Sequence, residues 1–104
     1  MIQRFCFVKL LPDEVGTRAE MAEMVRAQLL SAGADAVVGI PADDSAKKWD
    51  LSIVVTAASL AAWNALAAQP AMTGVFDELA GRAEVVKAWT FSTIGDDDEV
   101  DLVR

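Results

Sequence analysis

The fold of this chain is decided by residues 2–11, which read IQRFCFVKLL. Aromatic and β-branched residues dominate this run and a proline follows it, which predicts a β-strand. Successive side chains of a strand point to opposite faces, so Phe5 and Phe7 share one face while Cys6 and Val8 share the other. Because both faces carry apolar side chains, we expect the strand to be covered on both sides.

Downstream of this strand, apolar residues recur at helical spacing and predict a helix over residues 17–32. Thr17 and Glu20 are spaced as a capping box, in which the threonine hydroxyl accepts a hydrogen bond from the backbone N–H of Glu20. Gly33 is expected to end the helix in a left-handed conformation. A short strand over residues 36–40 and a polar turn then follow.

Residues 49–56, WDLSIVVT, form the clearest strand of the chain. Val54 interrupts an otherwise polar face, which indicates that both faces of this strand are at least partly buried. Ser59 is expected to cap the next helix and Pro70 to end it. The remaining elements are predicted to be two helices and a last strand: 60–68, 72–80 and 85–93.

This order predicts an α+β fold of the ferredoxin-like βαββαβ type, with a four-stranded antiparallel sheet and helices on one face only. The other sheet face would carry Phe5, Phe7 and Val54. Burying such side chains is worth roughly 1.5–3 kcal/mol each. A homodimer that packs two of these faces together is therefore expected, since two-fold dimers are the commonest assemblies. The apolar fraction of 54% also exceeds what one small core needs.

Charge divides the 104 residues into a domain over 1–95 and an acidic C-terminal tail over 96–104. The tail holds five acids and one arginine, a net charge of −4 out of −7, which leaves −3 for the domain. We expect no basic patch, and therefore no nucleic-acid partner and no attraction to an anionic membrane. The tail lacks the glycine and the spaced ligands of a calcium loop, so no metal site is expected.

The chain has one cysteine, Cys6, which rules out an internal disulfide and fits a reducing compartment. No secretory signal and no apolar run of about 20 residues is visible. These features favour a cytoplasmic protein.

Four local patterns lie in order along residues 2–93. They are Lys9-Leu10, Val38-Gly39-Ile40-Pro41, Trp49-Asp50-Leu51 and Gln69-Pro70-Ala71-Met72. Together they resemble the stress-responsive A/B barrel (Dabb) domain family. The resemblance implies a dimeric α/β barrel, formed by the sheets of two subunits, with cavities between each sheet and its helices.

The chain departs from this family at the positions that carry chemistry. The family commonly has His-Pro-Ala-His where this chain has Gln69 and Met72. The plant polyketide cyclase of the family places histidines where Arg4 and Leu51 stand here, and a tyrosine where Leu66 stands. The chain contains no histidine and no tyrosine, so the cyclase chemistry is not carried over.

Few residues remain that could act on a substrate. Asp50 is the best candidate for an acid or base, although it could instead pair with a loop amide or with Lys47 or Lys48. Arg4 could hold an anionic or enolic group at the mouth of a sheet–helix cavity, or form a surface ion pair. Cys6 has no histidine to activate it and is expected to be a small buried residue.

The resemblance implies a pocket for a flat apolar ligand, although aromatic residues at strand and helix spacing are more often part of the core. Its candidate residues are Arg4, Trp49, Leu51, Trp63, Leu66, Met72, Phe76 and Trp89. No cofactor is expected, because the chain has no phosphate-binding glycine loop.

Three functions fit these observations. The first is a non-catalytic Dabb-type dimer that binds a small apolar or aromatic molecule between sheet and helices. The second is a cofactor-free enzyme on the same scaffold, of monooxygenase or isomerase type. The third is a structural dimer that assists another enzyme.

Overall fold

Seven regular elements follow one another along residues 1–95, the part of the chain that the structure, a computed structural model, describes. They are β1 (Ile2–Leu10), α1 (Arg18–Ser31), β2 (Asp35–Gly39), β3 (Leu51–Ala57), α2 (Leu60–Ala67), α3 (Pro70–Arg82) and β4 (Ala83–Ser92). Two 3₁₀ turns, η1 (Pro12–Thr17) and η2 (Asp44–Lys47), lie between them. The predicted α+β, ferredoxin-like order is confirmed. The predicted acidic tail, 96–104, lies outside the described residues.

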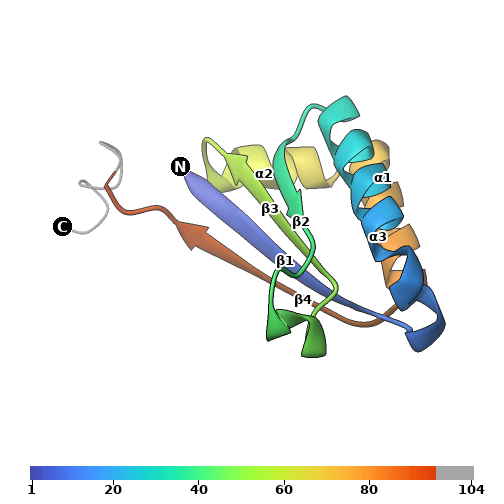
Figure 1. Ribbon diagram of the computed structural model, residues 1–104. Coiled ribbons are helices and arrows are strands. Elements are labelled where there is room, and N and C mark those ends of the chain that lie inside the picture. Colours follow the sequence, from blue (N-terminus) through green and yellow to red (C-terminus); the bar gives the residue numbers. More distant parts are fainter. Residues whose placement is uncertain (96–104) are drawn as a thin grey trace.

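The four strands form one antiparallel sheet in the order β2-β3-β1-β4 (Figure 1). In the centre of the sheet, Cys6 lies opposite Ile53 of β3 and Ala88 of β4. The helices pack on the face to which these side chains point, and α1 and α3 lie side by side there. Val25 and Leu29 of α1 are fully buried against this face. The core therefore lies between the sheet and its own helices.

The ends of the helices differ in part from the predicted ones. Ser59 caps α2 as predicted, because its Oγ accepts a hydrogen bond from the N–H of Ala62 at 3.1 Å. Gly33 follows α1 with a φ of +88°, which also confirms the prediction. The capping box at Thr17 is wrong: η1 leads directly into α1, and the Thr17 hydroxyl donates to the carbonyl of Glu14 instead. Pro70 both ends α2 and starts α3, since proline suits the first turn of a helix.

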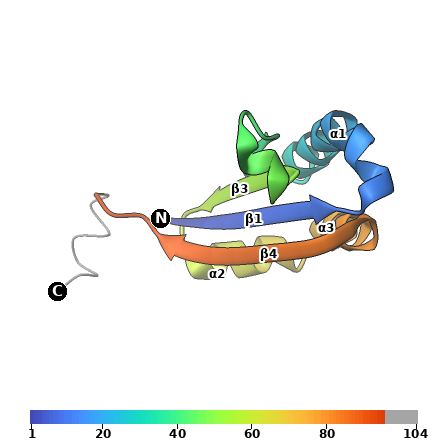
Figure 2. The same cartoon turned by 60° about the horizontal axis from the view of Figure 1, so that its bottom comes forward.

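The sheet face away from the helices, called the open face below, is covered by no helix of residues 18–82; only the η2 region lies beside it, where Trp49 packs against Phe7. Phe5 and Phe7 lie on it, and the register between β1 and β4 places Trp89 and Phe91 of β4 beside them. Figure 2 shows β4 running alongside β1 at this edge of the sheet. Trp89 is 46% exposed and Phe91 56% exposed, although both are large and apolar. Val54 of β3 points to the same face, beside Phe5. The predicted apolar face therefore exists and extends across β1, β3 and β4, with its aromatic residues on β1 and β4.

The described helices include none that is long and apolar enough to cross a membrane.

Candidate functional site

A cleft of about 240 Å³ lies between the sheet and the helices α2 and α3. Strand residues form its floor, and Trp63 of α2 and Phe76 of α3 close it from the helix side. Its full lining is Arg4, Cys6, Ile53, Val55, Trp63, Phe76, Val86 and Ala88. Arg4 is the one charged residue in this lining, so the cleft is an apolar pocket with a single cation.

The side chain of Arg4 is held from two directions. Its Nη1 donates a hydrogen bond of 2.8 Å to the hydroxyl of Thr90 on the neighbouring strand β4. Its guanidinium carbon lies 5.8 Å from the centre of the Trp63 ring, within the range of a cation–π contact. Within residues 1–95 no carboxylate lies within ion-pair distance of Arg4. The surface ion pair considered for Arg4 is therefore wrong for the described residues, and its charge is available to a ligand.

Cys6 contributes its thiol to the same cleft and is almost fully buried. Burial raises the pKa of the Cys6 thiol, and the charge of Arg4 lowers it to a smaller extent. The thiol therefore stays protonated near neutral pH, and a protonated thiol is a poor nucleophile. Cys6 contributes apolar surface to the cleft.

Asp50 lies beside the other end of β1, where its carboxylate binds a backbone amide. Its Oδ2 accepts a hydrogen bond of 2.8 Å from the N–H of Leu10, and its Oδ1 lies 3.4 Å from Nη1 of Arg18. A backbone amide was one of the predicted partners of Asp50, and the structure identifies it as the amide of Leu10. The charged partner is Arg18 and not Lys47 or Lys48. Arg4 and Leu10 are six residues apart on one strand, roughly 20 Å, so Asp50 and Arg4 do not converge.

The structure divides the predicted pocket residues into three groups. Arg4, Trp63 and Phe76 line the cleft together. Leu51 and Met72 lie in the closed core, and Leu66 packs against that core. Trp49 and Trp89 line a different hollow on the open face.

Sequence reasoning missed the apolar floor of the cleft and the hydrogen-bond partner of Arg4. Val55 and Val86 share the strand face of Arg4 and Cys6, so side-chain alternation could have identified both. Thr90 gave no such signal, because its place beside Arg4 depends on the register between β1 and β4. Among residues 1–95, no three His, Cys, Asp or Glu side chains gather in a way that could hold a metal ion.

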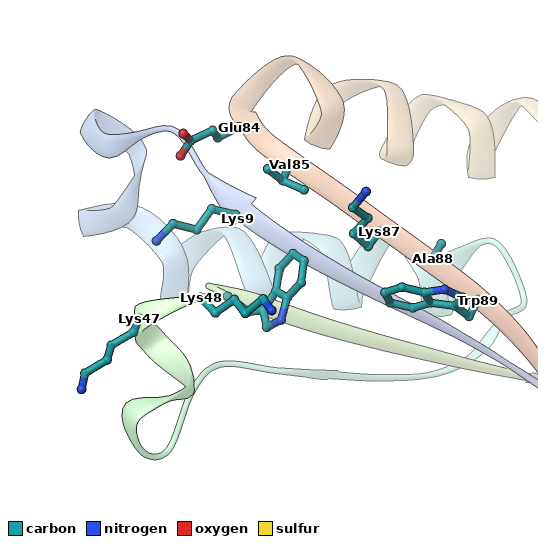
Figure 3. A pocket seen from close by; sticks show the side chains of 9 residues that line it. Lys9, Lys47, Lys48, Glu84, Val85, Lys87, Ala88 and Trp89 are labelled. Carbon is teal, nitrogen blue, oxygen red and sulfur yellow. The ribbon is translucent and has the colours of Figure 1, made fainter.

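The hollow on the open face has a volume of about 660 Å³ and is strongly basic (Figure 3). Trp49 and Trp89 line it, together with all four lysines of the chain: Lys9, Lys47, Lys48 and Lys87. The lysines come from β1, the η2 region and β4, and Glu84 is the one carboxylate in the lining. The expectation that the chain has no basic patch is therefore wrong, because the sheet brings together lysines that are scattered along the sequence.

No protein-family model matches the chain, and no curated protein matches it. Solved structures do match. A dimeric ferredoxin-like protein of unknown function from Bacteroides fragilis superposes with a TM-score of 0.71 at 14% identity, covering 88% of this chain and 95% of that one. A dimeric ferredoxin-like protein of unknown function from Thermobifida fusca gives 0.67 at 15% identity, covering 88% and 90%.

A protein described as an antibiotic biosynthesis monooxygenase superposes with a TM-score of 0.70 at 7% identity, covering 91% of this chain and all of that one. These similarities show that the chain has the ferredoxin-like fold. At such low identity they extend to the fold alone, so membership of the Dabb family stays a prediction.

Proposed function

We propose that this chain forms a homodimeric, Dabb-type domain that binds a small apolar or aromatic molecule in the cleft between the sheet and helices α2 and α3. The ligand would carry an anionic or enolic oxygen, which Arg4 would contact. The single observation behind this proposal is a guanidinium without a carboxylate partner among residues 1–95, in an otherwise apolar cleft.

The physical argument follows from the surroundings of Arg4. A charge in an apolar cleft loses part of its hydration, so an oxygen anion placed there interacts with it more strongly than in water. Guanidinium offers several N–H donors in one plane and suits a carboxylate or an enolate. Thr90 accepts from one nitrogen only, which leaves other donors for a ligand. The volume of about 240 Å³ restricts the ligand to a small molecule of one or two rings.

Arg4→Gln is expected to weaken binding of 2-naphthoate about tenfold or more, because a hydrogen bond to a charged group is worth roughly 1.5–3 kcal/mol. The measurement is titration calorimetry, supported by the rise in melting temperature that a ligand of the native state produces. Arg26→Gln is the matched control, since it removes the same charge from an exposed position on α1.

The uncharged analogue 2-naphthalenemethanol is expected to bind weakly to the native protein and equally to Arg4→Gln. Equal affinity of native protein and Arg4→Gln for 2-naphthoate would contradict the role of Arg4. If neither compound, nor a wider set of small aromatic acids and enols, binds the native protein, a structural role for the dimer would be favoured instead.

The open face supports the homodimer part of the proposal. Phe5 and Phe91 form an edge-to-face pair with ring centres 5.7 Å apart, and Phe7 contacts both Trp49 and Trp89. A face of linked aromatic rings exposed to water is costly, and face-to-face packing of two sheets would bury it. A cytoplasmic location, where thiols stay reduced, suits the unpaired Cys6.

A cofactor-free monooxygenase is a second candidate, favoured by the placement of Arg4 beside apolar cleft surface. A guanidinium there would stabilise the enolate of an aromatic ketone, whose own electrons reduce O₂. One oxygen atom would enter the substrate and the other would leave as water.

2-Tetralone, a two-ring ketone that forms an enolate, is a suitable probe for this reaction. The native protein is expected to consume oxygen above the spontaneous rate of the probe, and Arg4→Gln to lose that excess. The measurement is an oxygen-electrode trace with and without protein. Identical traces would exclude this reaction for the probe and leave the binding proposal standing.

A further inference from the structure

The basic hollow on the open face has no place in the proposed ligand site, which lies on the other side of the sheet. Four lysines and one carboxylate line it, in a chain whose net charge is −7. Like charges held together repel each other unless an anionic group lies between them. Figure 3 shows Lys9, Lys48 and Lys87 around the hollow, with the ring of Trp89 at one end and Lys47 directed away.

The same chain carries a group of matching charge. Residues 96–101 read DDDEVD, which places five carboxylates and one apolar residue in six positions. This segment follows β4, the strand that itself contributes Lys87 and Trp89 to the hollow.

We propose that the hollow binds the acidic segment 96–101 of a second copy of this chain. Lys9, Lys48 and Lys87 would pair with its carboxylates, and Trp49 and Trp89 would contact Val100. The inference rests on the homodimer of the proposed function. Each copy would bind the acidic segment of the other, so the dimer would gain one ion-paired contact at each end of the aromatic interface.

The position of β4 favours a segment from the second copy over one from the same chain. Ser92, where β4 ends, pairs with Ile2, whereas Val85 at the hollow pairs with Lys9. These two points are seven residues apart on one strand, roughly 23 Å. A return within the same chain would run along the open face, which the second sheet covers in the proposed dimer. A two-fold axis lying across the strands instead brings the end of one β4 to the hollow of the other copy.

The contact can be tested by zero-length cross-linking with a carbodiimide, which joins lysine amines to carboxylates that touch them. Equal amounts of ¹⁴N- and ¹⁵N-labelled full-length protein are refolded together, cross-linked, digested with trypsin and analysed by mass spectrometry. Side-chain carboxylates of the tryptic peptide 88–104 lie only at positions 96–99 and 101, so fragment spectra assign each link. We expect links from Lys9, Lys48 and Lys87 to this peptide, with mixed isotope labels in about half of the linked pairs.

Three outcomes decide the inference. Links in which both peptides always carry the same label would place the segment on its own chain and overturn the proposal. A dimeric mass with no links from these lysines would also overturn it, while leaving the homodimer intact. A monomeric mass by light scattering would overturn the homodimer itself, together with the inference that rests on it.

Salt dependence gives a second measurement. Neutralising Lys9, Lys48 and Lys87 to glutamine is expected to raise the dimer dissociation constant roughly 1.5- to 5-fold for each ion pair lost, and to remove most of its dependence on salt. Arg26→Gln, on the helix side, is expected to change neither. A triple variant with an unchanged dissociation constant and an unchanged salt dependence would contradict the proposal.

Discussion

Phe7→Asp is expected to convert the proposed homodimer into a monomer at micromolar concentration. Phe7 lies in the middle of the open face, with its ring centre 5.7 Å from that of Trp49 and 6.1 Å from that of Trp89. Burying one phenylalanine is worth roughly 1.5–3 kcal/mol, and a two-fold interface loses two of them. The dissociation constant should therefore rise roughly a hundredfold to ten-thousandfold, before the cost of burying a carboxylate is added.

Light scattering and sedimentation equilibrium measure the effect, and circular dichroism reports whether the fold is kept. Leu60→Asp is the control, since it places the same charge on an exposed apolar residue of α2, on the helix side of the sheet. If Phe7→Asp does not fold, Phe91→Asp tests the same face at a more exposed position. An undiminished dimer in a folded variant of either kind would show that the two copies meet through another surface.

Asp50→Ala is expected to lower the free energy of unfolding by roughly 2–3 kcal/mol. Asp50 is 1% exposed, and its Oδ2 accepts the N–H of Leu10 where β1 ends. Alanine would leave that buried N–H without its partner and Arg18 without its carboxylate. For a domain of this size the melting temperature should fall by about 10–20 °C, measured by thermal denaturation at one fixed protein concentration.

The isosteric Asp50→Asn separates a structural role from a catalytic one. Its side-chain oxygen can still accept the N–H of Leu10, so we expect most of the stability to return. Asp44→Ala, at an exposed position in η2, should leave the melting temperature almost unchanged. A stable Asp50→Ala protein would contradict the structural role given to this carboxylate.

The predictions for Asp50 and Arg4 concern residues whose chemical type is notable in the sequence, but whose partners only the structure shows. Asp50 was a candidate acid or base, and the structure gives it the amide of Leu10, forty positions away in the sequence. Arg4 was a candidate anion-binding group, and its partner Thr90 stands eighty-six positions away. Contacts of this kind depend on strand register, which is set by the packing of the whole sheet.

The sequence alone determined the order of the elements and the apolar character of both sheet faces. Alternation along residues 2–11 already separated Phe5 and Phe7 from Cys6 and Val8, because strand geometry turns every second side chain to the same side. The cap at Ser59 and the turn at Gly33 were also predictable, since each depends on a few neighbouring residues. The cap expected at Thr17 is absent because the Thr17 hydroxyl donates a hydrogen bond to the carbonyl of Glu14 in the preceding turn, η1.

Only the tertiary structure decided which aromatic residues share a cavity and which lysines share a hollow. Trp63 lines the cleft together with Arg4, whereas Trp49 and Trp89 lie on the open face. The four lysines line one hollow because the fold places β1, β4 and the η2 region side by side. Local patterns fix the period and the ends of an element through nearby backbone geometry. The pairing of distant elements instead depends on how their apolar faces pack together, and one segment alone does not contain that information.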